Sequence, residues 1–168
     1  MTLKTLKTVL TMPTISRRTA LVAALGIAGA GSLQTVAAAN LPVADALAEA
    51  LAKALAAGRP LLVMVSLEGC PYCKIVRDHH LDPMREREGL AVVQVDMRSK
   101  QSIRDFRGKV STHDELIRSW GVKVAPSVLF FGRGGAEVAE RLVGGYIPDF
   151  YGAYLDERLR TAVKAIGG

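Results

Sequence analysis

The chain of 168 residues contains only two cysteines and three histidines. Two cysteines are too few for a disulfide-rich scaffold or a four-cysteine metal site, and the histidines do not stand at zinc-finger spacing. No run of about 20 apolar residues follows residue 40, which excludes a multi-span membrane protein. Internal repeats at solenoid or propeller spacing are also absent. The hydrophobic fraction of 49% is ordinary for a folded domain and too high for a disordered chain.

Acidic residues are absent from residues 1–39, which contain four basic residues, Lys4, Lys7, Arg17 and Arg18. The other 129 residues contain 18 basic and 16 acidic residues, so the formal net charge of +6 falls to +2 for this body. A nearly neutral body argues against a nucleic-acid partner. The basic residues within 98–109 are accordingly expected to lie in a solvated loop.

Residues 1–39 have the three-part layout of a secretory signal peptide, with a basic start, an apolar stretch at 20–33 and small residues at 37–39. The apolar stretch is short for a membrane span of about 20 residues. The pair Arg17-Arg18 partly matches the twin-arginine export motif, and both this route and the general secretory route stay open. An uncleaved membrane anchor is the alternative. Residues 40–168 are expected to form one domain outside the cytoplasm, most simply in a bacterial periplasm.

Hydrophobic periodicity predicts alternating helices and strands in this domain. Helices are expected at residues 46–57, 71–80, 112–120 and 148–166, and strands at residues 61–65, 90–95, 127–131 and 136–143. Asp45 is expected to cap the first helix, and Thr112 to Glu115 form a capping box. A break is expected at residues 81–83, a charged connection at 85–89, and a loop with some helix at 98–110. The order predicts a parallel crossover followed by an antiparallel hairpin, in one mixed sheet with helices on both faces.

Both cysteines lie in one unit, Cys70-Pro71-Tyr72-Cys73, directly after a predicted buried strand and at the start of a predicted helix. The N-terminus of a helix stabilises a thiolate, and a spacing of two residues brings the sulfurs within bonding range. Pro71 suits the first helical turn, where its missing N–H costs nothing. An exposed thiolate beside a resolving thiol is what thiol–disulfide exchange requires.

Other functions for this unit stay open on the residues alone. One is an inert structural disulfide, although so small a loop constrains the unfolded chain little. Another is a copper site made of both cysteines and one histidine. Lys74 stands where a haem-attachment site needs His, and half of a zinc site would lack its second pair. His79 and His80 are expected to be solvated or to compensate the helix dipole.

The Cys-x-x-Cys unit, the order of elements and residues 120–131, in which Pro126 opens an apolar strand, together resemble the thioredoxin-like family. The resemblance covers residues 45–166. It implies an α/β thioredoxin fold: a central mixed four-stranded sheet flanked by helices, with an extra N-terminal helix. It also implies that Pro126 is a cis-proline and that the backbone of Ala125 pairs with a substrate segment.

The resemblance further implies that Cys70 is the attacking thiolate and that Cys73 resolves the mixed disulfide, so that the two form a redox-active disulfide. Pro71 and Tyr72 would complete the substrate groove. Met64 stands where thioredoxins carry a buried acid, six residues before the first cysteine. Glu68 is a candidate proton-transfer helper in its place, with a solvated loop residue as the alternative.

The Pro-Tyr dipeptide is typical of glutaredoxins, so a glutaredoxin-like reductase is an alternative. The long N-terminal helix and the export signal instead favour exported thioredoxin-like proteins, including the SoxW type. The sequence therefore predicts an exported thiol–disulfide oxidoreductase, with the reductase direction favoured. Its partners would be exported proteins with cysteine pairs and a membrane or periplasmic thiol redox partner.

No metal or organic cofactor and no nucleic-acid partner are expected, and the protein is expected to be a monomer. The alternative from another functional class is a non-catalytic metallochaperone or binding module on a thioredoxin scaffold.

Overall fold

The computed structural model of the protein describes residues 40–145 and 148–167. The predicted signal peptide, its twin-arginine pair and its cleavage site therefore lie outside the described residues. Within the part that is described, no helix has both the length and the apolar character needed to cross a membrane.

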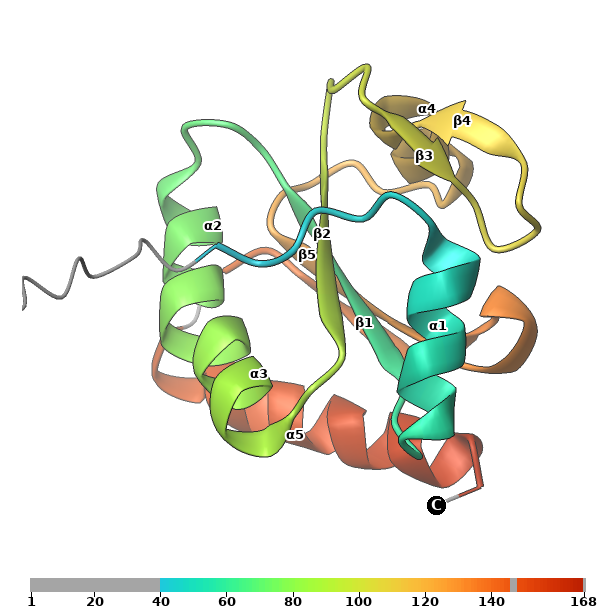
Figure 1. The fold of residues 1–168 in the computed structure, drawn as a ribbon. Helices are drawn as coiled ribbons and strands as arrows, with labels where there is room; N and C mark the ends of the chain where they lie inside the picture. The colour runs from blue at the N-terminus through green and yellow to red at the C-terminus, as the bar shows by residue number, and fades with distance from the viewer. Residues whose placement is uncertain (1–39, 146–147, 168) are drawn as a thin grey trace, which may run out of the picture. The chain divides into compact units, whose positions relative to one another are not determined.

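A four-stranded mixed sheet forms the centre of the domain (Figure 1). Its strands are β1 (Leu61–Ser66), β2 (Val92–Asp96), β5 (Ser127–Phe131) and β6 (Glu137–Val143), in the spatial order β2-β1-β5-β6. The β1–β2 pair is parallel, whereas the β1–β5 and β5–β6 pairs are antiparallel. The predicted parallel crossover and the predicted hairpin are thus confirmed.

The two middle strands are buried along their whole length. Both are continuous apolar runs, as expected for strands that have helices on both faces. Alternate residues of β1 contribute to different cores, so that Met64 belongs to one apolar cluster and Val63 to the other. This period of two follows from the pleat of a strand.

Helices cover both faces of the sheet (Figure 1). Helix α1 (Leu47–Ala56) and helix α4 (His113–Ser119) pack in the core that contains Val63, and a capping box at Thr112 starts α4 as predicted. The other core receives a helical run and a long C-terminal helix. These elements are α2 (Pro71–Val76), the π-helical turn η1 (Arg77–Leu81), α3 (Asp82–Glu88) and α5 (Pro148–Ala165).

The predicted break at residues 81–83 and the charged connection at 85–89 are wrong. The chain stays helical through the π turn and continues as α3, which ends at Gly89 with φ 66°. Pro83 lies in the first turn of α3, where a missing N–H is tolerated. The predicted cap by Asp45 is also wrong, because the N-cap residue is Ala46 and no side chain bonds there.

Residues 98–110 do not form a loop with some helix. They contain β3 (Ser102–Arg104) and part of an antiparallel partner, β4 (Val110–Thr112), which form a separate two-stranded sheet. Ile103 is buried in the core below this sheet. One buried side chain in three residues is too short a pattern to indicate a strand. A 3-10 turn, η2 (Arg133–Gly135), connects β5 to β6.

The segment before α1 extends the sheet beside β2. The backbone N–H of Gln94 donates to the carbonyl of Pro42 at 2.8 Å, and the N–H of Ala44 donates to the carbonyl of Gln94 at 3.0 Å. Leu41 is buried in the core. Residues 41–44 are therefore part of the packed domain.

Candidate functional site

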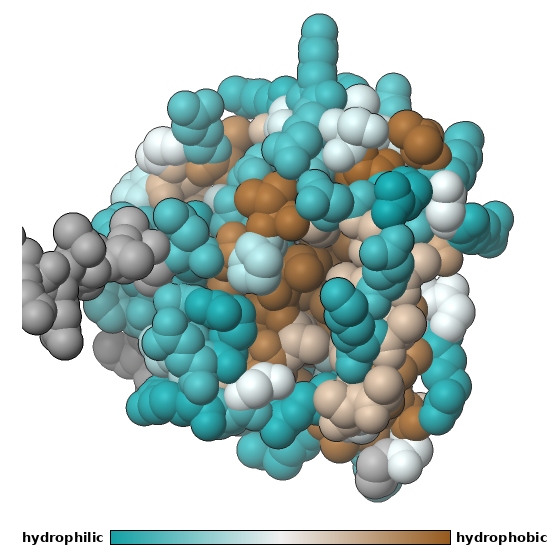
Figure 2. All heavy atoms as spheres, viewed as in Figure 1, coloured by the Kyte–Doolittle hydropathy of each residue, from teal (hydrophilic) through white to brown (hydrophobic). Residues whose placement is uncertain are grey.

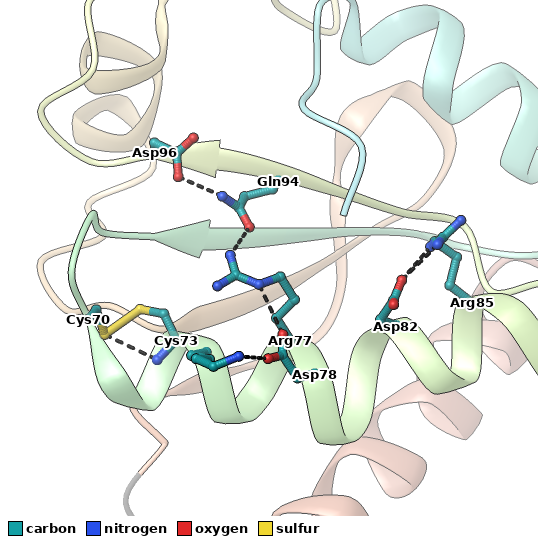
Figure 3. Close-up of polar contacts among 9 residues, drawn as sticks. Cys70, Cys73, Arg77, Asp78, Asp82, Arg85, Gln94 and Asp96 are labelled. Carbon is teal, nitrogen blue, oxygen red and sulfur yellow. Dashed lines mark hydrogen bonds and ion pairs between the residues drawn. A yellow bond between two sulfur atoms is a disulfide. The ribbon is translucent and has the colours of Figure 1, made fainter. Parts of the chain in front are cut away.

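The two cysteines form a disulfide at the start of α2 (Figure 3). Their Cα atoms lie 5.3 Å apart. Cys70 is the N-cap residue of α2, and its Sγ accepts a hydrogen bond from the backbone N–H of Cys73 at 3.1 Å. Pro71 occupies the first helical turn, as predicted. The Sγ of Cys70 therefore lies at the positive end of a helical run, where a thiolate is stabilised.

The two cysteines differ in their access to solvent. Cys70 is half-buried, whereas Cys73 is 1% exposed and lies in the apolar cluster with Met64, Val76 and Phe130. An external reactant can therefore approach Cys70 but not Cys73. This asymmetry is what an attacking sulfur and a protected resolving sulfur require.

A second segment, far away in the sequence, borders Cys70. Its Sγ lies 4.0 Å from the carbonyl oxygen of Ala125, and the peptide bond between Ala125 and Pro126 is cis. Pro126 is buried, and a Cβ on Gly145 would lie 3.3 Å from both Pro126 Cγ and Tyr72 Cβ. The structure therefore brings together the residues that the sequence analysis assigned to a substrate groove.

The surface around these predicted groove residues is partly apolar. Tyr72 is 49% exposed and Val124 46% exposed, and Pro71 is exposed beside them. Glu68 lies on the other side of Cys70, exposed in the loop between β1 and α2. Its side chain makes no hydrogen bond or ion pair among the residues that the structure describes. Its proton-transfer role remains a prediction.

A polar chain that no sequence motif indicated runs beside the disulfide (Figure 3). Asp78 pairs with Lys74 one turn before it, and accepts from Arg77 Nε at 3.3 Å. The Nη1 of Arg77 donates to Gln94 Oε1 at 3.0 Å, and Gln94 Nε2 donates to Asp96 Oδ1 at 2.7 Å. Burial alone would raise the pKa of Asp78, but the hydrogen bonds and charges of Lys74 and Arg77 outweigh it and hold the pKa below its usual value. The helix and β2 are thus connected at the end nearest Cys70.

A cavity of about 930 Å³ opens beside Cys70, bounded by this polar chain. Its lining comes from the loop after β1, the start of the helical run and the end of β2, namely Ser66, Leu67, Glu68, Gly69, Cys70, Pro71, Lys74, Arg77, Gln94, Asp96, Met97, Arg98 and Ser99. Neither Ala125 nor Pro126 belongs to that lining. Cys70 therefore lies between a partly apolar surface, at Tyr72 and Val124, and a polar cavity.

The family model of the thioredoxin-like domain matches residues 47–158, which include both cysteines and Pro126. The chain belongs to the thioredoxin-like domain family.

Solved structures include several similar chains. A thioredoxin from Thermus thermophilus is 26% identical, with a TM-score of 0.49 over 76% of this chain and 92% of that chain. A DsbH oxidoreductase is 22% identical, with a TM-score of 0.49 over 79% of this chain and 92% of that one. The periplasmic thioredoxin SoxS from Paracoccus pantotrophus is 22% identical, with a TM-score of 0.42 over 61% of this chain and 98% of that one. No curated protein matches the chain significantly.

The two adjacent histidines of this thioredoxin-like chain lie in different surroundings. His79 is exposed. His80 packs on Tyr151, with ring centroids 5.0 Å apart. Burial and the neighbouring His79 lower the pKa of His80, against a smaller opposing effect of Asp156. Among the described residues, no three His, Cys, Asp or Glu side chains come together in a way that could hold a metal ion.

A second groove, of about 620 Å³, lies between α1 and the outer edge of β2. Figure 2 shows apolar side chains gathered between α1 and α3, with polar side chains around them. Val43, Ala50 and Val93 contribute to the groove, and no cysteine does. The groove is therefore separate from the chemistry at Cys70.

Proposed function

We propose that this thioredoxin-like protein is an exported thiol–disulfide oxidoreductase in which Cys70 attacks and Cys73 resolves. The observation that carries the proposal is the unequal exposure of two bonded cysteines at a helix start. Cys70 is accessible and is hydrogen-bonded by an N–H group, whereas Cys73 is 1% exposed. A structural disulfide needs neither feature.

The reaction begins with the reduced pair. The Cys70 thiolate attacks one sulfur of a substrate disulfide, so that a mixed disulfide forms and the other substrate sulfur leaves as a thiolate that takes up a proton. Cys73 then loses its proton and attacks the Sγ of Cys70, which closes the internal disulfide and releases the second substrate thiol. The substrate gains two electrons and the protein loses two. The redox partner sets the direction, and we favour the reductase direction.

The partly apolar surface beside Ala125, at Tyr72 and Val124, is the proposed site for a protein substrate. An extended segment can hydrogen-bond to the backbone at Ala125, as in strand addition, while Tyr72, Pro71 and Pro126 contact its side chains. Because the carbonyl of Ala125 lies 4.0 Å from the Sγ of Cys70, a segment bound there is held beside the attacking sulfur. On the opposite side of Cys70, Glu68 is the proposed helper for proton transfer.

We further propose that residues 1–39 are a signal peptide, removed after Ala39, and that residues 40–168 act in the periplasm as a monomer of the SoxW type. The backbone contacts of Pro42 and Ala44 with Gln94 beside β2 lie after this boundary. Cleavage after Ala39 leaves these contacts intact. The proposed partners are exported proteins with cysteine pairs and a membrane or periplasmic thiol that resets the redox state.

Trapping tests the function directly. A Cys73→Ser variant should accumulate mixed disulfides through Cys70, which non-reducing electrophoresis detects and dithiothreitol dissolves. The matched Cys70→Ser variant should trap nothing. The wild type should reduce the disulfides of insulin, and both variants should lose this activity. Failure of the wild type to reduce insulin, together with no trapped partner, would refute the proposal.

The same variants separate this function from a metallochaperone. A metal carrier would bind Cu(I) tightly and stoichiometrically, and would not exchange disulfides. A Cu(I) titration of the reduced wild type, run beside the insulin assay, therefore distinguishes the two functions.

A further inference from the structure

The polar cavity beside Cys70 differs in its chemistry from the partly apolar surface at Tyr72 and Val124. Two small residues leave it open, since Ser66 carries only a hydroxymethyl group and Gly69 has no side chain. Its volume of about 930 Å³ is at the upper end of the range of about 300–1,000 Å³ usual for small-molecule sites. A disulfide that Cys70 attacks has two halves, and the cavity can hold one of them.

The floor of the cavity carries a fixed donor and a fixed acceptor. Arg77 is held by Asp78 at Nε and by Gln94 at Nη1, and its side chain is 19% exposed. Its Nη2 donates to no acceptor among the described residues. Gln94 also holds Oδ1 of Asp96, and no donor in the described part of the chain reaches Oδ2 of Asp96. A guanidinium N–H and a carboxylate oxygen are thus already oriented and unpaired.

The backbone at both sides of Asp96 is also fixed. The N–H of Asp96 donates to Nδ1 of the buried His113 at 3.1 Å. The N–H of Arg98 donates to Oδ1 of Asp114 at 3.1 Å, and Arg98 has a positive φ of 64°. The end of β2 and the loop after it are therefore tied to the start of α4 at two positions. A ligand that binds there does not have to order it, which preserves affinity.

The rim carries charges of both signs. Lys74 and Arg98 are exposed basic residues, and Glu68 is an exposed acidic residue. Together with Arg77 and Asp96, the lining contains three basic and two acidic side chains. Such a site complements a ligand that carries a carboxylate and an ammonium group close together.

We propose that this cavity binds small disulfides whose two halves are amino acids or short peptides, with the carboxylate at Arg77 and the ammonium group at Asp96. This inference rests on the proposed attack by Cys70. The sulfur of one ligand half bonds to the Sγ of Cys70 while the ligand disulfide breaks, and the departing half leaves as a thiolate that takes up a proton. Cys73 then releases the second half, so that one cystine-type disulfide becomes two thiols and the protein dithiol becomes a disulfide.

A series of four disulfides tests the inference on the wild-type protein. The probes are cystine, cystamine with ammonium groups only, dithiodipropionate with carboxylates only, and neutral hydroxyethyl disulfide. The rate at which each oxidises the reduced protein is divided by the rate at which it oxidises dithiothreitol, which removes differences in the leaving thiol. Cystine should give a ratio about tenfold above those of cystamine and dithiodipropionate, which each lack one charged group, because one charge-assisted hydrogen bond has about this effect. Hydroxyethyl disulfide lacks both charged groups and should give the lowest ratio.

Variants then locate the effect. Arg77→Met should lower the cystine ratio about tenfold, to that of cystamine, and Asp96→Asn should lower it about tenfold, to that of dithiodipropionate. Arg87→Met is the matched control, because Arg87 lies on α3 outside the cavity lining, and it should leave the cystine ratio unchanged. If Arg77→Met does not fold, Arg98→Gln removes an exposed charge of the same site.

The outcomes separate the two proposals. Equal ratios for all four disulfides overturn the cavity assignment, and so does a dithiodipropionate ratio equal to that of cystine. A fall of the cystine ratio in Arg87→Met as large as the fall in Arg77→Met overturns it as well. In each of these cases the reduction of insulin still supports the exchange function. A wild type that reacts with neither insulin nor any small disulfide refutes the exchange function itself.

Discussion

The buried His113 joins three segments, one of which, the end of β2, lines the polar cavity, and its replacement tests this arrangement. The side chain is fully buried. Its Nδ1 accepts from the N–H of Asp96 at 3.1 Å, and its Nε2 faces the carbonyl oxygen of Ala44 at 3.4 Å. Because a carbonyl can only accept, the tautomer that carries its proton on Nε2 fits both contacts. The end of β2, the segment before α1 and the start of α4 thus meet at one ring.

His113→Leu should lower the free energy of unfolding by about 2–3 kcal/mol. The largest part is the part-buried N–H of Asp96, which loses its acceptor at a cost of about 1–3 kcal/mol. The long contact to Ala44 contributes less, and the similar side-chain volume limits the packing loss to less than about 1.5 kcal/mol. Against a total stability of about 5–15 kcal/mol for a domain, this loss is easily measured.

His113→Asn is the informative comparison, because the Oδ1 of Asn lies in the position of Nδ1 and can still accept from Asp96. Asn leaves a small cavity, so we expect a loss of about 1–1.5 kcal/mol, smaller than that of the Leu variant. Guanidinium unfolding of the oxidised proteins, followed by the fluorescence of Trp120 beside Phe131, measures both losses at equal m-values. A Leu variant at least as stable as the Asn variant would refute the reasoning.

Three further variants have defined outcomes. Thr112→Ala removes the side chain that caps α4 and should cost about 1 kcal/mol in chemical unfolding, with insulin reduction unchanged; no loss would contradict the capping role. Gly145→Val would place side-chain atoms against Pro126 and Tyr72, so insulin reduction should fall at least about tenfold while the cysteines remain oxidisable; an unchanged rate would show that this contact is irrelevant. The pKa of His80 is lowered in the folded state, so the imidazole takes up a proton at higher pH in the unfolded state than in the folded state. The stability that the neutral imidazole of His80 contributes is therefore present above about pH 6.5 and declines below it. His80→Phe should therefore reduce the decline in stability between about pH 6.5 and pH 5, measured by urea unfolding, and an unchanged slope would contradict the assignment.

Sequence reasoning succeeded where the structure depends on local pattern. The apolar run at residues 61–65 predicted a buried strand, and the structure has β1 there with every residue buried. The capping box at Thr112 is present because both of its hydrogen bonds join residues three apart. Such contacts are decided by the neighbouring sequence, so they can be found without knowledge of the fold.

The wrong predictions concern features that the local sequence pattern does not decide. Pro83 suggested a helix end, but the π turn before it lets the chain accommodate proline in a new first turn. The strand around Ile103 was missed because only this one side chain reaches the core. Its backbone pairs with residues 110–112, and no local pattern of that length reports such pairing.

From sequence alone came the pair Cys70–Cys73 at a helix start, the order of the four strands of the main sheet, and the proline before β5. The tertiary structure alone decided that Cys73 is buried while Cys70 is accessible, and that the carbonyl of Ala125, 55 positions along the chain, borders the Sγ of Cys70. It also placed Arg77 against Gln94, 17 positions away on β2, and so formed the floor of a cavity. The physical reason is that a helix start is set by neighbouring residues, whereas access and charge placement depend on which strands pair and which side chains they bring together.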